Sequence, residues 1–247
     1  MAQQNSILPF TGKLGNLIGY RRNGKFLLRS MPEIVRQTRG TRRAAQRFGM
    51  ASKKGALIRH AFYSELDVCH DKSHINRLTG ILIPSAGNNI KSITGFRFNK
   101  HTGTDRFFIQ APQLSADGIL HIPAQTLPVC KGITSLEAKV IVTRINFATH
   151  QVVATESNVL VIDLHESFNG AVVSVDIPGK GALVVTLQVR GVQDNIPSRN
   201  TRYLAADIVA VQLPQTLPVF HKQVYPQPQN ILYTNYTHSQ PSIILRE

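Results

Sequence analysis

The feature that most constrains the fold is a strict alternation of apolar and polar residues in the second half of the chain. Leu183, Val185 and Leu187 occupy alternate positions. Thr186 and Gln188 have the opposite parity. Because successive side chains of a strand point to opposite faces, this spacing predicts a strand with one apolar face. It is not the spacing of an amphipathic helix, whose apolar residues recur every three or four positions.

Short apolar runs rich in β-branched residues follow one another from residue 89 to residue 212, and we interpret each run as a strand. Dipeptides typical of turns separate them, namely Thr102-Gly103, Asp117-Gly118, Asn169-Gly170 and Pro178-Gly179. No helical pattern lies between the runs, which argues against a parallel α/β sheet. The sequence therefore predicts a mainly β fold, an antiparallel β-sandwich of the Ig-like or a related type.

The N-terminal region carries the strongest hairpin signal of the chain, the dipeptide Asn23-Gly24 between two short apolar-aromatic stretches. Asn-Gly suits the two central positions of a type I′ turn, which both need a positive φ. We predict a small hairpin with Tyr20 and Phe26 near its tip. Its basic residues are Arg21, Arg22, Lys25 and Arg29.

A helix is expected next, with Thr41 as its N-cap after Gly40. Apolar or small residues then recur at steps of four and three, which places them on one helix face. These residues are Ala44, Phe48, Ala51, Gly55, Ile58, Phe62 and Leu66. A second, shorter helix is predicted over residues 71–80.

Three regions result: 1–88 with the basic hairpin and the helices, 89–212 with the β-sandwich, and a proline-rich tail, 213–247. The tail holds five prolines and ends in "SIILRE", which could form one more strand. Such a terminal strand could close its own sheet or pair with that of a neighbouring subunit.

The charge of the chain is concentrated at its beginning. Residues 1–60 hold 13 Lys and Arg against one acid, Glu33, a net charge of +12. Residues 61–247 hold 15 Lys and Arg against 13 acids, a net charge of +2. This asymmetry is typical of a chain that meets a polyanion, an acidic protein or an anionic membrane surface.

The stretch 36–54, "RQTRGTRRAAQRFGMASKK", contains seven Arg and Lys and no acid. The planar guanidinium fork matches phosphate oxygens, and such contacts position a protein without reading sequence. The candidate contacts for nucleic acid or another polyanion are Arg36, Arg39, Arg42, Arg43, Arg47, Lys53 and Lys54, with Arg21, Arg22, Lys25 and Arg29 as a second cluster. An acidic protein surface, self-assembly and a merely solvated face remain alternatives.

The sequence contains no recognisable catalytic motif. It has no G-x-S-x-G, and the glycine-rich stretch "GKLGNLIG" has neither P-loop nor dinucleotide-loop spacing. Asp163 and Glu166 form the closest acid pair of the β region, and such a pair at a strand end is usually solvated. We therefore expect a protein that is not an enzyme and needs no cofactor.

A metal site is considered at "CHDKSH", which brings Cys69, His70 and His74 together in sequence. His70 and His74 are four residues apart and would share a helix face, as zinc ligands can. No second ligand pair follows at a standard spacing, so we predict no metal. The two cysteines, Cys69 and Cys130, are expected to be reduced thiols.

The first sixty residues contain a G-x-x-G-x-x-x-G stretch, an aromatic residue, Arg-Asn-Gly-Lys, an arginine before a proline, and a T-x-x-A-A-Q-R-F-like helix. The positions of this pattern are Gly12, Gly15, Gly19, Tyr20, Arg22, Asn23, Gly24, Lys25, Arg29, Pro32, Thr41, Ala45, Gln46, Arg47 and Phe48. In this pattern the chain resembles a family of uncharacterised bacterial and prophage-encoded basic proteins. Arg42 and Arg43 depart from the small or polar residues of that pattern. The resemblance implies a non-enzymatic module with virion-like or assembly associations.

Two functions follow as expectations. The first is a basic binding protein that contacts nucleic acid or another polyanion with little sequence specificity. The second is a self-assembling structural protein, such as a virion, filament or tail component, whose basic arm and terminal strand contact neighbouring subunits. No run of apolar residues is long enough for a membrane span, so we expect no membrane insertion and a cytoplasmic or virion-associated location.

Overall fold

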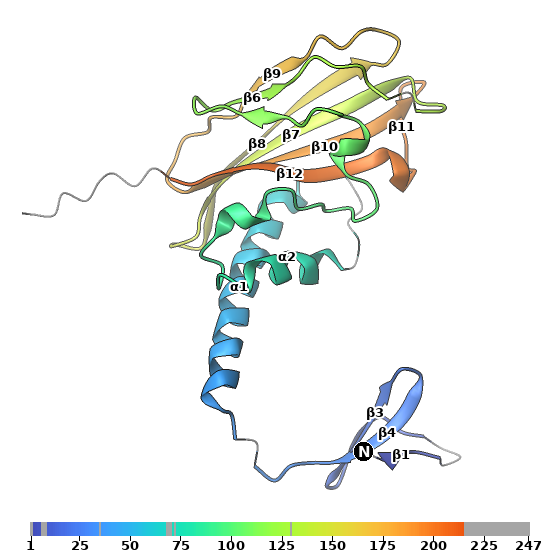
Figure 1. The fold of residues 1–247 in the computed structure, drawn as a ribbon, viewed down its shortest axis with the longest axis vertical. Helices are drawn as coiled ribbons and strands as arrows, with labels where there is room; N and C mark the ends of the chain where they lie inside the picture. Colours follow the sequence, from blue (N-terminus) through green and yellow to red (C-terminus); the bar gives the residue numbers. More distant parts are fainter. Residues whose placement is uncertain are drawn as a thin grey trace, which may run out of the picture. The chain divides into compact units, whose positions relative to one another are not determined.

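The computed structural model (Figure 1) describes residues 2–5, 9–34, 36–67, 71, 73–128 and 130–214. Strands account for 37% of the residues and helices for 22%, so the protein is mainly β. The sheets of the described part are antiparallel and open. The predicted mainly β, antiparallel class is confirmed. The proline-rich tail from residue 215 onward and its predicted terminal strand lie outside the described residues.

The largest sheet has five strands: β7 (Ser135–Asn146), β8 (Gln151–Asp163), β10 (Ala182–Gln193), β11 (Ile196–Pro197) and β12 (Leu204–Gln212). β10 lies between β7 on one side and β12 with β11 on the other. β8 is a single strand of 13 residues, although its sequence has the two apolar runs that we expected as separate strands.

One face of this sheet packs against a smaller, three-stranded sheet. The smaller sheet consists of β5 (Gln113–Leu114), β6 (Ile119–Ile122) and β9 (Ala171–Ser174), in the order β5-β6-β9. Leu120 and Ile122 of β6 belong to the same buried cluster as Leu183, Val185 and Leu187 of β10. The apolar face predicted for β10 therefore forms the core between the two sheets.

The other face of the five-stranded sheet is covered by two helices, α1 (Arg39–Tyr63) and α2 (His74–Leu82). Ile58 and Phe62 of α1 share a buried cluster with Val184 of β10. Because of this helix layer, Thr186 and Gln188 are fully buried, although their alternation with apolar residues had suggested a polar face. The inner strands β7 and β10 are thus covered on both faces, whereas β8 at the edge is largely exposed.

The segment between α2 and β5 begins the region in which we interpreted each apolar run as a strand, but its apolar residues form no regular strand. It contains the 3₁₀ turns η1 (Ile90–Ile93) and η2 (Thr104–Arg106), and a third turn, η3 (Thr201–Tyr203), precedes β12. Phe96 and Phe98 fill the core instead of forming a ladder. The backbone of this segment follows the outer edge of β12, where the Phe98 N–H donates to the carbonyl oxygen of Ala206 at 2.8 Å. Its aromatic residues are buried without a regular strand.

The N-terminal residues form their own four-stranded sheet, the N-terminal sheet. Its strands are β1 (Ala2–Gln3), β2 (Gly12–Leu14), β3 (Leu17–Arg22) and β4 (Lys25–Ser30), in the order β1-β4-β3-β2. Asn23 and Gly24 have φ values of 52° and 77°, as a type I′ turn requires. The predicted basic hairpin is confirmed.

The side chain of Gln4 ties the start of the chain to this hairpin. Its Nε2 donates to the carbonyl oxygens of Phe10 and Leu27, both at 3.1 Å, and its Oε1 accepts from the Phe10 N–H at 3.0 Å. Phe10 then crosses β3 at Gly19, where an added Cβ would lie 2.5 Å from the Phe10 carbonyl oxygen. Glycine at position 19 is required by this close approach.

Helix α1 starts earlier than predicted, because its N-cap is Thr38 and not Thr41. Thr38 has extended backbone angles, and its Oγ1 accepts a hydrogen bond from the Thr41 N–H at 3.1 Å. The predicted apolar face is buried from Ala51 onward. Phe48, on the same predicted face, is 55% exposed. Only the second half of the helix belongs to the core.

This division of α1 can be tested with two substitutions of the same type. Phe62→Ala should reduce the free energy of unfolding by about 3–5 kcal/mol, because it removes a fully buried ring. Phe48→Ala should change it by less than about 0.5 kcal/mol, because surface substitutions have small effects. Denaturant unfolding of the two variants and of the unaltered protein measures these changes in the free energy of unfolding. Equal losses would contradict the boundary between the buried and exposed halves of α1.

Candidate polyanion interface

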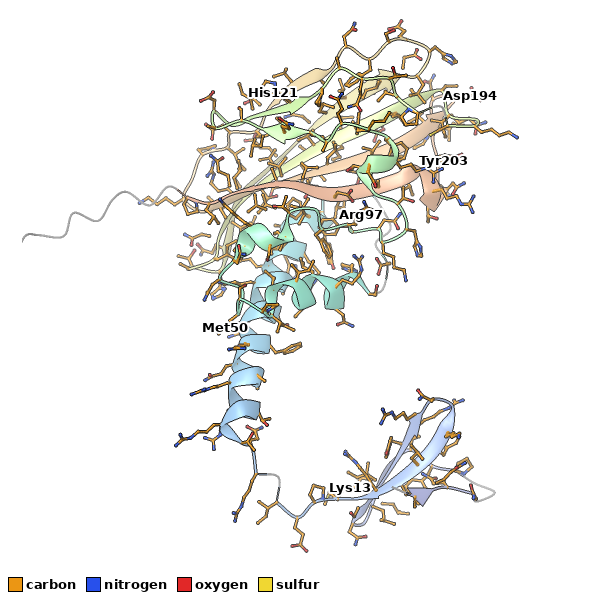
Figure 2. All side chains as sticks on the ribbon, in the orientation of Figure 1. Lys13, Met50, Arg97, His121, Asp194 and Tyr203 are labelled. Atoms are coloured by element: carbon orange, nitrogen blue, oxygen red, sulfur yellow. The ribbon has the colours of Figure 1, made fainter. Side chains whose placement is uncertain are left out.

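The first half of α1 is an exposed basic rod. Every residue from Arg39 to Phe48 is exposed, over a length of about 15 Å at about 1.5 Å per residue. At about 100° per residue, its arginines and the lysines that follow fall within an arc of about 140° on one side of the helix. These residues are Arg39, Arg42, Arg43, Arg47, Lys53 and Lys54. Met50, labelled on this helix in Figure 2, is exposed as well.

The position of these arginines opposes the helix dipole. Arg39, Arg42 and Arg43 lie in the first two turns of α1, and its first turn contains no acid. The N-terminal end of a helix carries partial positive charge, so each nearby cation costs about 0.3–1 kcal/mol. An external anion would offset both the dipole and the arginines.

Three further cations of the stretch 36–54 are not equally exposed to solvent. Arg36 is exposed in the segment before α1, and Lys53 is exposed on the helix. The Lys54 ammonium is half-buried: it donates to the carbonyl oxygen of Gly87 at 2.9 Å and lies 5.9 Å from the ring centroid of Phe147. Lys54 therefore helps to hold α1 on the rest of the fold.

The pairing register of the N-terminal sheet sorts its basic residues between two faces. Directly paired residues of antiparallel strands share a face, and neighbours along a strand alternate. Arg22 pairs with Lys25, Ile18 with Arg29, and Lys13 of β2 with Ile18. One face, here called the basic face, therefore carries Lys13, Ile18, Tyr20, Arg22, Lys25, Leu27 and Arg29.

Arg21 belongs to the opposite face, although we had predicted it together with Arg22 and Lys25. It pairs with Phe26, and its Cζ lies 5.5 Å from the centroid of that ring. Lys13, labelled in Figure 2, is a basic-face residue that the sequence prediction missed. A signal was present, because Gly15-Asn16 is a hairpin dipeptide that returns β2 onto β3.

Five cations of the larger part of the fold, in contrast, have carboxylate partners. Lys139 lies 3.3 Å from Glu65 and 3.5 Å from Asp67, and Arg190 lies 2.7 Å from Glu137. The other pairs join Arg77 to Asp71 at 2.5 Å, Arg97 to Asp105 and Asp207 at 3.0 and 3.9 Å, and Arg144 to Asp176 at 3.3 Å. In the described residues, seven carboxylates are engaged in this way with five cations, none of them from the first sixty residues.

No ion pair among the described residues joins the basic residues of the hairpin, the segment before α1 or α1 itself to a carboxylate. This holds for the whole predicted set: Arg21, Arg22, Lys25, Arg29, Arg36, Arg39, Arg42, Arg43, Arg47, Lys53 and Lys54. Arg42 reaches only the carbonyl oxygen of Gln37, at 3.5 Å. The positive charge of this region is not neutralised by the described carboxylates.

Hydrogen bonds and nearby cations lower the pKa values of two carboxylates close to the helix layer, Asp71 and Asp67. Although burial raises it, hydrogen bonds from Ser73 and Arg77 hold the pKa of Asp71 well below its usual range. Burial also opposes ionisation of Asp67, but Gln188, Lys139 and Arg190 lower its pKa overall.

Asp207 shows the opposite behaviour. Burial raises its pKa, despite hydrogen bonds to its Oδ2 from the Thr104 N–H at 2.7 Å and Oγ1 at 2.9 Å. Its Oδ1 is buried and has no hydrogen-bond partner in the described structure. Arg97, whose Nε lies 3.9 Å from Oδ2, is the nearest cation.

The other candidate residues of the sequence form neither a catalytic pair nor a metal site in the described structure. Asp163 and Glu166 are both exposed, and Asp163 accepts from the His165 N–H at 2.8 Å. Cys69 and His70 lie outside the described residues. His74 is buried and hydrogen-bonded to Tyr63. Among the described residues, no group of three or more His, Cys, Asp or Glu could hold a metal ion.

Comparisons with family models, with curated proteins and with solved structures found no match for this chain. Across the described residues, none of the helices combines the length and the apolar character that crossing a membrane demands.

The lowered pKa of Asp71 leads to a prediction about stability. Asp71→Asn should reduce the free energy of unfolding at pH 7 by about 2 kcal/mol, the order of a hydrogen bond to a charged group. Because the folded-state pKa lies below the ordinary 3.8, this contribution is complete above that value and is lost as the pH falls through the folded pKa. Unfolding curves from pH 7 down to pH 2 should show a constant difference above 3.8 and a shrinking difference below that value. Asp176→Asn, at a 74% exposed carboxylate, is the control and should change little; a pH-independent difference at Asp71 would refute the assignment.

Proposed function

We propose that the protein binds nucleic acid, or a polyanion of similar charge density, through its basic N-terminal region and with little sequence specificity. The observation that carries the proposal is the concentration of exposed cations at the N-terminal end without a carboxylate partner among the described residues. The ion pairs of the described structure engage seven carboxylates with five cations, and none of these cations belongs to the first sixty residues.

Three further properties support this function. Seven basic residues in nineteen, mostly arginine, provide forks that suit phosphate oxygens. The exposed half of α1 carries arginines where the helix dipole disfavours them, and a bound phosphate reverses that cost. Two of the predicted residues are left out of the contact set. The Lys54 ammonium is engaged with Gly87 and Phe147, and Arg21 lies over the Phe26 ring on the face of the N-terminal sheet opposite to Arg22.

Binding through phosphates predicts a steep salt dependence. If about five phosphates of duplex DNA are neutralised, the slope of log affinity against log salt should be near −4 to −5. Replacing Arg42, Arg43 and Arg47 together by Gln should make this slope shallower by about 3 and weaken binding to all sequences alike. Fluorescence anisotropy of a labelled duplex at stepped salt concentrations measures both effects.

A control variant with the same change of net charge shows whether the effect on binding comes from the α1 arginines themselves or from the total charge of the protein. Lys131, Lys180 and Arg199 are exposed cations of the β region without an ion pair in the described structure. Their joint replacement by Gln removes the same three charges and should leave the slope nearly unchanged. A flat salt response of the unaltered protein, or equal effects of the two triple variants, would overturn the proposal.

We also propose that the fold is a β-sandwich and that the protein is not an enzyme. Two antiparallel sheets that share one buried cluster support a β-sandwich, Ig-like or related, with a helix layer on its outer face. The lack of a recognisable catalytic motif and the resemblance of the first sixty residues to a non-enzymatic family support a binding module that is not an enzyme and that works in the cytoplasm or in a virion-like assembly.

A second candidate function, self-assembly, is favoured by strand β8. β8 pairs only with β7 among the described strands, so one edge of its 13 residues has no described partner. It contains neither lysine nor proline, the residues that commonly protect edge strands, and Val159 and Val161 are 57% and 66% exposed. In this case the basic region would meet acidic surfaces of neighbouring subunits.

Self-assembly through β8 predicts a change of mass with two substitutions. Val159→Lys combined with Val161→Lys should shift the protein from oligomer to monomer in light scattering coupled to size exclusion. Val172→Lys is the control, because this valine of the smaller sheet is 67% exposed and lies on β9. An unaltered protein that is strictly monomeric at high concentration would contradict this second function.

A further inference from the structure

The basic face of the N-terminal sheet has a composition that a pure phosphate-binding surface would not need. Its four cations, Lys13, Arg22, Lys25 and Arg29, are exposed. They surround Ile18, Tyr20 and Leu27, which are half-buried on the same face. A charged border around an apolar and aromatic centre suits a ligand that has both phosphates and flat, apolar rings.

The register arranges the cations in two rows. Arg22 and Lys25 pair at the hairpin tip, and Arg29 and Lys13 flank Ile18 at the other end. The rows are four residues apart along β3, or about 14 Å at about 3.4 Å per residue. Tyr20 and Leu27 form the pair between them. A strand of a few nucleotides that crosses the sheet would place phosphates on both rows and a base at the centre.

Tyr20 and Arg29 supply the centre with stacking surfaces. The Arg29 Cζ lies 5.8 Å from the centroid of the Tyr20 ring. Unpaired bases stack on aromatic rings and on guanidinium planes, both of which are present here. Bases of a duplex are already stacked inside the helix and cannot use such a centre without unpairing.

The opposite face of the sheet is partly covered by the chain and carries fewer cations. Phe10 crosses it at Gly19 and is held there by Gln4, so part of this face is already covered by the chain itself. Arg21 is the one cation that the described β3 and β4 contribute to it. The basic face carries four of the five cations of β2, β3 and β4 and is not the face that Phe10 crosses, so we place the ligand there.

From these observations we infer that the basic face binds single-stranded nucleic acid, with Lys13, Arg22, Lys25 and Arg29 on the phosphates and Tyr20 beneath a base. This rests on the proposed function and deepens it, because it names the form of nucleic acid and the site that reads it. The exposed half of α1 needs only phosphates and accepts duplex as well.

The test uses the full chain with a labelled single-stranded oligothymidine and, separately, a labelled duplex of equal length. Tyr20→Leu keeps the apolar volume and removes the ring, and it should weaken single-strand binding about tenfold, in the range of one lost base stack. It should leave duplex binding unchanged. Tyr20→Phe keeps the ring and should bind like the unaltered protein, which controls for folding of the sheet.

Two variants that remove one charge each, from opposite faces of the N-terminal sheet, test which face binds the single strand. Lys13→Gln should make the single-strand salt slope shallower by about 0.7, the value for one phosphate. Arg21→Gln removes the same charge from the opposite face and should leave the slope unchanged. Unaltered single-strand binding by Tyr20→Leu, or equal effects of Lys13→Gln and Arg21→Gln, would overturn the inference.

The two proposals fail in different ways. If the duplex binds with a steep salt slope that responds to the α1 arginines, but the Tyr20 and Lys13 variants bind the single strand normally, only the inference about the basic face is wrong. If neither nucleic acid binds with a salt-dependent affinity, the proposed function itself is wrong.

Discussion

The burial of the inner strands β7 and β10 on both faces constrains where charge can lie in this protein. The helix layer covers a face that contains polar residues, so Gln188, Lys139 and Arg190 need partners there. An unpaired buried charge costs several kcal/mol, and Glu65 and Asp67 just after α1, with Glu137 of β7, prevent that cost. These acids are then occupied, and none of them is paired with the N-terminal cations of the described chain.

Helix α1 links the region of paired charges to the region of cations without a described carboxylate partner. Its second half is apolar and buried, and the chain just beyond it provides the acids that pair with Lys139. Its first half has arginines against the helix dipole and no carboxylate partner among the described residues. The same helix is therefore a structural element at one end and, in our proposal, a binding element at the other.

Local rules predicted the features that depend on local chemistry. Asn23-Gly24 gave the hairpin because positive φ is a property of those two residues, and alternation identified β10 because it depends only on position along the strand. The burial of Thr186 was not predicted, because a helix distant in sequence covers it. The basic residues of the candidate site were found by composition, but the assignment of Lys13 and Arg21 to faces needed the register, which pairing across strands sets.

The central claim is that the N-terminal arginines are available to an external anion and are not neutralised within the protein. Reaction of the full chain with an arginine-specific reagent, followed residue by residue by mass spectrometry, tests it most directly. The account predicts that Arg42, Arg43 and Arg47 react quickly in the free protein, far faster than the paired Arg77 and Arg190, and become protected when nucleic acid is added. If these three arginines react as slowly as Arg77 and Arg190 in the free protein, they already have partners and the account is contradicted.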